Sequence, residues 1–332
     1  MKMQKEILTA QREEYLYLYE EINSREIRLL KAYGKSPEVV LPDQIADKSL
    51  IAIGPYCFSE SNMLTPNQWE STASLNDLQK ENNWCALTGN YIVSVMLPDT
   101  VTILDPYAFY NCRKLERLEI GIQLDQIQSD AFMNCQSLHE LEIRGSVTDR
   151  TGLPFILNQI SQELEVIFQT EQGIEAKLIY PEYTESYEEI GPAHIFGLQV
   201  EGEGYRARKQ FRDGVWDGNG YDSIFTKASV EEKMTTLSKM VLNRLLYPVG
   251  LTVEHQKDYE GFLQREEKSI VSELVAGECL DELQFCISQK LLSDRSIELA
   301  LKLAVENGWV RGSAGILRSR RKLKSQEDPY AF

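Results

Sequence analysis

Histidine is nearly absent from this sequence, cysteine is sparse, and no long apolar run occurs. The 332 residues include 3 histidines and 6 cysteines. No C-x-x-C pair or histidine cluster of the kind that holds zinc is present, so we expect no metal site. Six cysteines are too few for a disulfide scaffold, and we expect them to be reduced. No apolar run approaches the roughly 20 residues that cross a bilayer, and the N-terminal segment lacks the apolar core of a signal peptide. We therefore expect a cytoplasmic protein that is not inserted in a membrane.

Positive charge is also scarce. Asp and Glu number 51 against 35 Lys and Arg, which gives a formal charge of -16. A surface of that sign repels phosphate backbones, so nucleic acid is not an expected partner. The last part of the chain is the exception, with basic residues at Arg311, Arg318, Arg320, Arg321, Lys322 and Lys324. These form either the polar face of a final helix or a contact for an acidic partner or anionic lipid.

Motifs that carry catalysis or bind cofactors are missing. No phosphate-binding P-loop or dinucleotide-binding glycine pattern occurs, so no cofactor is expected. The stretch Asp217–Asp222 has oxygen donors but lacks the spacing and closing Glu of a calcium loop. His139 and His255 have ordinary surroundings, and His194 in Gly-Pro-Ala-His-Ile-Phe has no Ser or Cys nucleophile motif beside it. The sequence predicts a protein that is not an enzyme. The alternative is an enzyme of unknown chemistry in residues 150–225, using His194 and nearby carboxylates.

An internal repeat is the strongest feature that is present. Residues 97–120 recur as residues 121–143, with identical residues 23 positions apart. The identical pairs are Ala108/Ala131, Phe109/Phe132, Asn111/Asn134, Cys112/Cys135, Leu115/Leu138, Leu118/Leu141, Glu119/Glu142 and Ile120/Ile143. A partial copy covers residues 50–58, and a half-copy covers residues 92–97. Such a repeat predicts a solenoid in which Phe109 stacks on Phe132 and Cys112 on Cys135 inside the coil.

The repeated pattern I-x-x-x-A-F-x-x-C-x-x-L-x-x-L-x-I resembles the BspA-type leucine-rich repeat over about residues 14–146. Residues 59–83 depart from it and are read as an insertion or a degenerate unit. The alternating Tyr15–Tyr19, a polar turn near Asn23 and Glu26–Leu30 predict a hairpin that caps the solenoid. The resemblance implies a bacterial solenoid protein that binds other proteins. Many relatives are secreted surface proteins.

The strand pattern L-x-x-L-x-I also predicts a binding face. It sends Leu115, Leu118 and Ile120 inward, so Arg117 and Glu119 point outward. The same register applies to neighbouring units and gives six candidate binding residues: Ser94, Met96, Arg117, Glu119, Glu140 and Glu142. Three of them are acidic, which favours a protein partner with a basic patch.

Beyond the solenoid the sequence pattern changes twice. The predicted fold class is α+β, with a solenoid over 1–146, a β-rich middle over 147–228, a helical region over 229–324 and a tail over 325–332. In the middle, residues 164–168, 174–180, 195–200 and 205–211 read as strands, and 153–159 reads as a short helix. A capping box at Ser229-x-x-Glu232 predicts the start of the helical region. Helices are then expected near 253–274, 281–291, 295–306 and 313–323, with a weak ankyrin-like pattern around Leu299–Leu317.

These patterns predict a non-catalytic interaction module, scaffold or adaptor that uses the solenoid sheet. In the adaptor form, the C-terminal helices bind one partner and the sheet binds another. A further candidate surface is the segment that carries Tyr180, Tyr183 and Tyr187 with Glu182, Glu185, Glu188 and Glu189, whose alternative is a strand edge protected by charge. The identity of the partner and the oligomeric state do not follow from the sequence.

Overall fold

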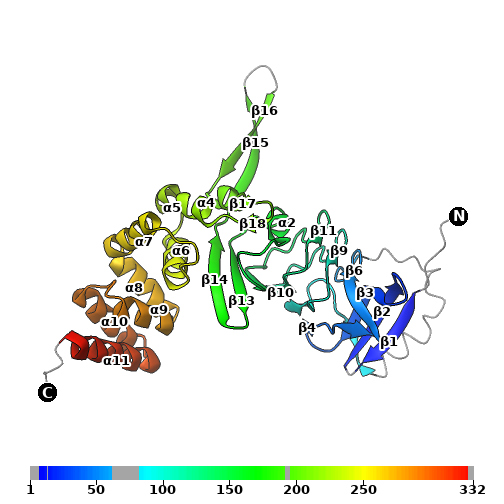
Figure 1. Cartoon of the computed structure of the whole chain (residues 1–332), viewed down its shortest axis with the longest axis horizontal. Helices are drawn as coiled ribbons and strands as arrows, with labels where there is room; N and C mark the ends of the chain where they lie inside the picture. Colours follow the sequence, from blue (N-terminus) through cyan, green and yellow to red (C-terminus); the bar gives the residue numbers. More distant parts are fainter. Residues whose placement is uncertain (1–6, 13, 62–81, 191–194, 328–332) are drawn as a thin grey trace. The chain divides into compact units, whose positions relative to one another are not determined.

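The computed structural model describes residues 7–12, 14–61, 82–190 and 195–327 (Figure 1). The chain divides into two compact units. The first contains Met1–Glu175 and Tyr180–Asp217, and the second contains Ala176–Ile179 and Gly218–Phe332. The domain boundaries predicted near residues 146 and 228 stay predictions.

The first unit begins with the predicted capping hairpin, which is confirmed. β2 (Tyr15–Glu21) pairs antiparallel with β3 (Glu26–Gly34), and β1 (Leu8–Arg12) lies on the outer edge of β2. One side of the hairpin is buried in a cluster of Leu16, Leu18, Leu30, Tyr33 and Trp84. β3 then runs parallel to β6 (Lys48–Ile53), so the hairpin covers the open end of the repeats.

The repeats form two parallel ladders, which confirms the predicted solenoid. One ladder stacks β6, β9 (Ile103–Leu104) and β11 (Gln126–Ile127). The other stacks β4 (Glu38–Val40), β8 (Ser94–Met96), β10 (Arg117–Gly121), β12 (Glu140–Arg144) and β13 (Leu164–Thr170), with β14 (Gly173–Tyr180) at its edge. Short strands β5 (Gln44–Ile45) and β7 (Cys85–Ala86) pair beside β6 and β3. The strand ladder therefore continues one strand past the sequence repeat, into β13.

Stacked phenylalanines fill the space between the two ladders. The ring of Phe109 lies 4.8 Å from that of Phe58 and 5.3 Å from that of Phe132, with interplanar angles of 9° on both sides. All three side chains are buried. The predicted stacking of Phe109 on Phe132 is confirmed, and Phe58 of the partial copy extends the stack.

The buried thiols follow the same spacing. Cys112 Sγ donates to the carbonyl oxygen of Phe58 at 3.1 Å, and Cys135 Sγ donates to that of Phe109 at 3.2 Å. Burial raises the pKa of Cys57 to about 12 and that of Cys112 well above its ordinary value. All six cysteines are free thiols in the structure. The three in the repeats act as small core residues rather than as nucleophiles.

Each turn of the solenoid bends at residues with left-handed backbone. Tyr107 and Asn111 have φ of 62° and 61°, and Asp130 and Asn134 have φ of 58° and 64°. Asn and Asp tolerate this conformation better than most residues. The two asparagines also bond to each other, since Asn134 Nδ2 donates to Asn111 Oδ1 at 2.8 Å. The 23-residue spacing of the repeat thus places the corners as well as the core.

The middle of the chain is partly as predicted. Helix α2 (Leu153–Leu157), strands β13 and β14 and the strand at 195–200 are confirmed, the last as β16 (Ile195–Glu201), which pairs with β15 (Thr184–Ile190). The strand predicted over 205–211 is wrong. Short helix α3 (Gly204–Ala207) occupies it, and β17 (Phe211–Arg212) and β18 (Val215–Trp216) follow around a turn at Asp213 and Gly214. The helical turn buries Arg208, whose guanidinium needs nearby carbonyls that an extended strand would not supply.

The second unit is helical. Its elements are α4 (Gly218–Ser223), α5 (Phe225–Glu231), α6 (Met234–Leu246), α7 (Val253–Arg265), α8 (Glu267–Ala276), α9 (Leu280–Ser288), α10 (Asp294–Glu306) and α11 (Val310–Glu327). The helix predicted over 253–274 is two helices, which meet at Glu266. α8 packs with α9 and α10 with α11, as the predicted helix pairs do. The ankyrin-like pattern stays a prediction.

The capping box predicted at Ser229 is wrong. Ser229 lies inside α5, where its hydroxyl donates to the carbonyl of Thr226 at 2.9 Å, and α6 begins at Met234 after Lys233. Phe225 and Ala228 of α5 are buried, and their packing stabilises the helix on both sides of Ser229. Side-chain caps occur elsewhere: Thr252 accepts from the amide of His255, and Ser293 accepts from that of Ser296.

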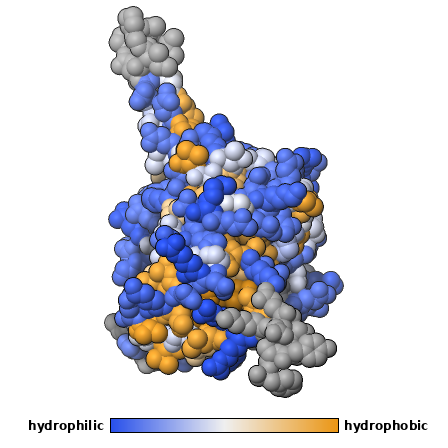
Figure 2. Space-filling view, turned by 90° about the vertical axis from the view of Figure 1, so that its left-hand side faces the viewer, coloured by the Kyte–Doolittle hydropathy of each residue, from blue (hydrophilic) through white to orange (hydrophobic). Residues whose placement is uncertain are grey.

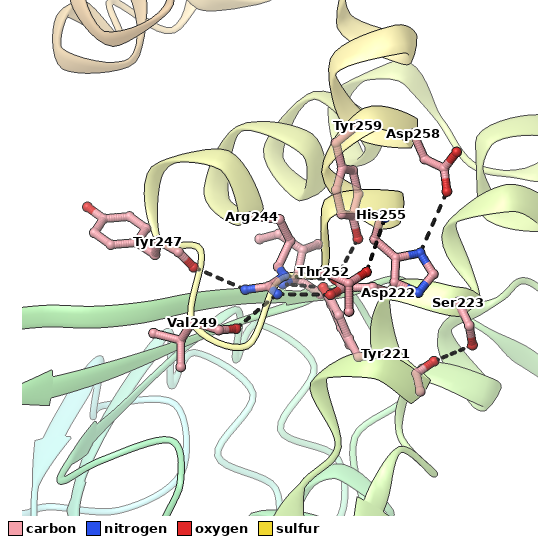
Figure 3. Close-up of polar contacts among 12 residues, drawn as sticks. Tyr221, Asp222, Ser223, Arg244, Tyr247, Val249, Thr252, His255, Asp258 and Tyr259 are labelled. Atoms are coloured by element: carbon pink, nitrogen blue, oxygen red, sulfur yellow. Dashed lines mark hydrogen bonds and ion pairs between the residues drawn. The ribbon is translucent and has the colours of Figure 1, made fainter. Parts of the chain in front are cut away.

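A buried ion pair holds the first helices of this unit together (Figure 3). Asp222 on α4 accepts from Arg244 Nε at 2.8 Å, from Arg244 Nη2 at 2.9 Å and from the Tyr259 hydroxyl at 2.9 Å. Burial and the Asp222 charge raise the pKa of Tyr259 well above its ordinary value, so the phenol keeps the proton that it donates. The adjacent Tyr221 bonds to both backbone groups of Ile179 in β14. The network joins α4, α6, α7 and the C-terminal end of β14.

Truncating the phenylalanine stack should destabilise the solenoid strongly. We expect Phe109→Ala to lower the free energy of unfolding by about 3–5 kcal/mol, because it removes a buried ring stacked on both sides. Phe132→Ala should fall in the same range. Chemical denaturation measures both, with Met133→Ala as control because Met133 is 44% exposed and should change stability by about 0.5 kcal/mol or less. Unfolding curves that match wild type would contradict the stack.

Breaking the buried ion pair should cost more than replacing it. Arg244→Met leaves the Asp222 carboxylate buried without its cation, and we expect a loss of about 3–5 kcal/mol. The double variant Asp222→Leu with Arg244→Met should recover most of that loss, since it removes both charges. Denaturation followed by far-UV circular dichroism, which is dominated by helices, measures the difference. A double variant no more stable than the single one would show that the pair is irreplaceable.

Candidate functional site

The six predicted binding residues lie on one face of the ladder formed by β4, β8, β10, β12 and β13. Parallel register places Arg117 of β10 between Ser94 of β8 and Glu140 of β12. The same register places Glu119 between Met96 and Glu142. Residues directly opposite in neighbouring strands share a face of the sheet. The structure thus brings together two columns of side chains, here called the sheet face, from the residues that the sequence selected.

A shallow groove of about 250 Å³ runs over the sheet face. All six predicted residues line it, together with Glu38, Val39, Val40, Val95 and Leu118. At its β4 end two apolar side chains are exposed, Val40 at 53% and Met96 of the neighbouring β8 at 36%, and the exposed carboxylate of Glu38 lies beside them. Its β12 end carries the carboxylates of Glu119, Glu140 and Glu142. The exposed apolar side chains therefore lie toward β4, and three of the four carboxylates of the groove lie toward β12, here called the acidic end.

The pKa of Glu142, at the acidic end, is raised above its ordinary value. Burial is the largest cause that raises the pKa of Glu142, and the charges of Glu119 and Glu140 raise it further. Arg144 and Arg117 act in the opposite direction without cancelling the shift. An incoming cation would relieve this repulsion, so the acidic end favours lysine or arginine side chains.

Arg144 is a residue of this face that the sequence analysis missed. Its guanidinium pairs with the carboxylates of Glu119 and Asp99 and donates to the carbonyl of Leu97 at 2.5 Å. The register places Gly121 of β10 directly opposite Arg144. A Cβ at Gly121 would lie 2.8 Å from Asp99 Cα, so the glycine leaves room for Asp99 to lie beside β10 and pair with Arg144. Arg144 occupies the position after the last apolar residue of its strand, which the repeat pattern leaves unspecified.

Glu119 is accordingly not a free outward carboxylate. It is bonded to Arg144 and its side chain is 24% exposed. Glu140 and Glu142 are also partly buried. Within the described residues, no group of three or more His, Cys, Asp or Glu is placed to hold a metal ion. The chemistry that the face offers is the acceptance of hydrogen bonds and charge pairing.

The enzyme hypothesis for residues 150–225 depends on His194 and nearby carboxylates. His194 lies outside the described residues. His139 is exposed, with Nδ1 2.9 Å from the carbonyl oxygen of Ser137, and His255 lies 3.6 Å from Asp258 on the same helix. The carboxylate of Asp217 pairs with Arg212 at 2.8 Å, and that of Asp222 is in the buried ion pair. Both carboxylates of the stretch Asp217–Asp222 are therefore in ion pairs.

The tyrosine-rich segment does not form one surface. Tyr180 is buried, Tyr183 is half-buried against Arg208, and Tyr187 is 70% exposed on β15. In the second unit the basic residues lie along α11, where Arg320 pairs with Glu298 at 2.9 Å. Arg318 and Lys322 of that helix line a hollow of about 520 Å³ shared with α9.

Comparison with known proteins places the repeats in a family. Residues 41–158 match the model of the BspA type leucine rich repeat region, in six copies. A leucine rich cell surface protein from Faecalibacterium prausnitzii A2-165 aligns with 51% of this chain at 19% identity and a TM-score of 0.27. The alignment spans 44% of that chain, less than half its length. No curated protein matches the sequence. No described helix is long and apolar enough to cross a membrane. Residues 41–158 are a BspA-type leucine-rich repeat region.

Proposed function

We propose that this chain is a protein-binding module that captures a basic segment of a partner on the sheet face. The observation that carries the proposal is the row of carboxylates at its β12 end, where burial and neighbouring charge raise the pKa of Glu142. Leucine-rich repeats suggest a protein-interaction or surface-binding role, because stacked units present one continuous sheet surface.

The groove also suggests the form of the bound segment. Adjacent strands lie about 4.8 Å apart, so β4 and β12 are separated by about 14 Å across three strand spacings. A segment that crosses the strands would set an apolar side chain against Val40 and Met96. Lysine or arginine further along it would then reach Glu140 and Glu142. The proposed partner therefore has an apolar residue followed by basic residues, which distinguishes it from a segment that is only cationic.

Scaffold or adaptor action and a cytoplasmic location remain predictions of the sequence. The cell surface description belongs to the Faecalibacterium protein. The alternative of an enzyme in residues 150–225 rests on His194 and nearby carboxylates, and His194 lies outside the described residues.

Charge reversal at the acidic end should abolish capture without unfolding the chain. We expect Glu140→Lys with Glu142→Lys to weaken binding of a Lys/Arg-rich partner by more than about tenfold, and wild-type binding to weaken as salt rises. Binding is measured by pull-down from the source cell followed by calorimetry with each captured protein. The matched control is Glu171→Lys with Glu306→Lys, two exposed carboxylates that do not line the groove, with the same change in net charge. Equal capture by wild type and both variants would place the binding surface elsewhere.

Glu142 should also give the module a pH signature. A raised pKa means that the ionised carboxylate costs stability at neutral pH, and that this cost disappears as the group is protonated on acidification. We therefore expect Glu142→Gln to be at least as stable as wild type at pH 7, with the advantage shrinking toward pH 4. Thermal melts across this range measure it, with Glu171→Gln as control. A stability advantage that grows on acidification would contradict the assignment.

A further inference from the structure

The base of the β15–β16 hairpin is held by a buried arginine. The Arg208 guanidinium donates to the carbonyl of Pro181 at 2.6 Å, just before the hairpin, and to that of Gly204 at 2.9 Å, just after it. It also donates to the carbonyls of Ile160 and Gln162, at 2.9 and 2.6 Å. Arg208 is 2% exposed. One side chain thus ties both ends of the hairpin to the chain that follows α2.

Glycine allows the two ends of the hairpin to approach this closely. A Cβ at Gly204 would lie 1.9 Å from the carbonyl oxygen of Pro181, and one at Gly202 would lie 2.6 Å from that of Glu182. Gly202 also has a φ of 92°, which side chains rarely adopt. The backbone N–H of Tyr183 also donates a hydrogen bond to the carbonyl oxygen of Ser161, at 3.0 Å. The ends are fixed by specific contacts, whereas residues 184–188 of β15 are exposed.

The hairpin above this base is a two-stranded sheet with no third strand among the described residues (Figure 1). Tyr187 of β15 lies opposite Leu198 of β16, and these side chains are 70% and 45% exposed. Figure 2 shows polar and apolar residues together along this projection. An isolated two-stranded hairpin is marginally stable in water, and its free edges present unpaired amide and carbonyl groups. The base of the hairpin is therefore fixed while its strand edges stay open, which is an arrangement suited to docking another strand.

Charge selects the partner and the edge. No lysine or arginine occurs between residues 182 and 204. On β15, Glu185 and Glu188 are exposed and three residues apart, so they project on opposite faces of the hairpin. The β16 edge carries the uncharged Gly197, Leu198 and Gln199. A strand added beside β15 would meet a carboxylate on each face with Tyr187 between them.

We infer that the β15 edge of this hairpin accepts an extended basic segment of a partner protein as a third strand. The segment has lysine or arginine at positions three apart, which reach Glu185 and Glu188, and an apolar residue beside Tyr187. Backbone hydrogen bonds to the free edge supply affinity, and the paired charges supply selectivity. A second copy of the hairpin fits poorly, because its own carboxylates would oppose Glu185 and Glu188. This surface is distinct from the sheet face and does not depend on it.

Hydrogen exchange on the full chain tests the inference with a defined probe. The probe is a peptide of repeated Lys-Val-Thr, in which successive lysines alternate faces of an extended strand. Its control is repeated Lys-Pro-Gly, which has the same charge spacing but cannot pair as a strand. We expect the first peptide to slow amide exchange over residues 184–188, and the second to leave it unchanged.

Variants connect the protection to the edge. Glu185→Lys with Glu188→Lys should weaken the Lys-Val-Thr peptide by about tenfold, since two exposed attractions become repulsions. The conservative Glu185→Gln with Glu188→Gln, which keeps strand shape, should weaken it less. Glu171→Lys with Glu306→Lys and Glu140→Lys with Glu142→Lys should both retain the protection at residues 184–188. The last result also separates this inference from the proposed function of the sheet face.

Three outcomes would overturn the inference. The first is absence of protection over residues 184–188 with the Lys-Val-Thr peptide. The second is equal protection by the Lys-Pro-Gly peptide, which would reduce the interaction to charge alone. The third is protection that rises with protein concentration in the absence of peptide, which would assign the edge to a second copy of the chain.

Discussion

The stack of Phe58, Phe109 and Phe132 is the constraint on which the repeat region depends. Each ring lies about one strand spacing from the next, at 4.8 and 5.3 Å, so the two parallel ladders on either side must advance by the same step. That common step holds the outward residues of β8, β10 and β12 in register. The sheet face is therefore a consequence of the core, since the same periodicity that stacks the rings aligns Glu119 with Glu142.

Two buried arginines solve related problems in the two units. Arg208 has backbone carbonyls as acceptors and fixes the ends of a hairpin, whereas Arg244 is neutralised by Asp222 and joins α6 to α4. Arginine suits both tasks, because its planar fork presents several donors in fixed directions. In each case a charged group is buried only where the surrounding acceptors satisfy it, as burial without partners would be costly.

Much of the repeat region was predictable because its signal is local and repeated. The spacing of 23 residues identified the inward Phe, Cys and Leu positions, and strand alternation then gave the six residues of the sheet face. Arg144 could not be found in this way, since its role depends on the room that Gly121 leaves across the neighbouring strand. The capping box at Ser229 failed for a related reason: burial of Phe225 and Ala228 outweighed a local preference.

The sequence by itself determined the period, the inward and outward residues of the repeat strands and the positions of most helices. These features depend on neighbours in the chain or on a repeat, and pattern alone expresses them. Only the tertiary structure decided that residues 204–207 are helical, that Arg208 ties the ends of β15 and β16, and that Asp222 pairs with Arg244. Such contacts join residues far apart in the sequence, and they form where burial leaves a charged or polar group that needs a partner.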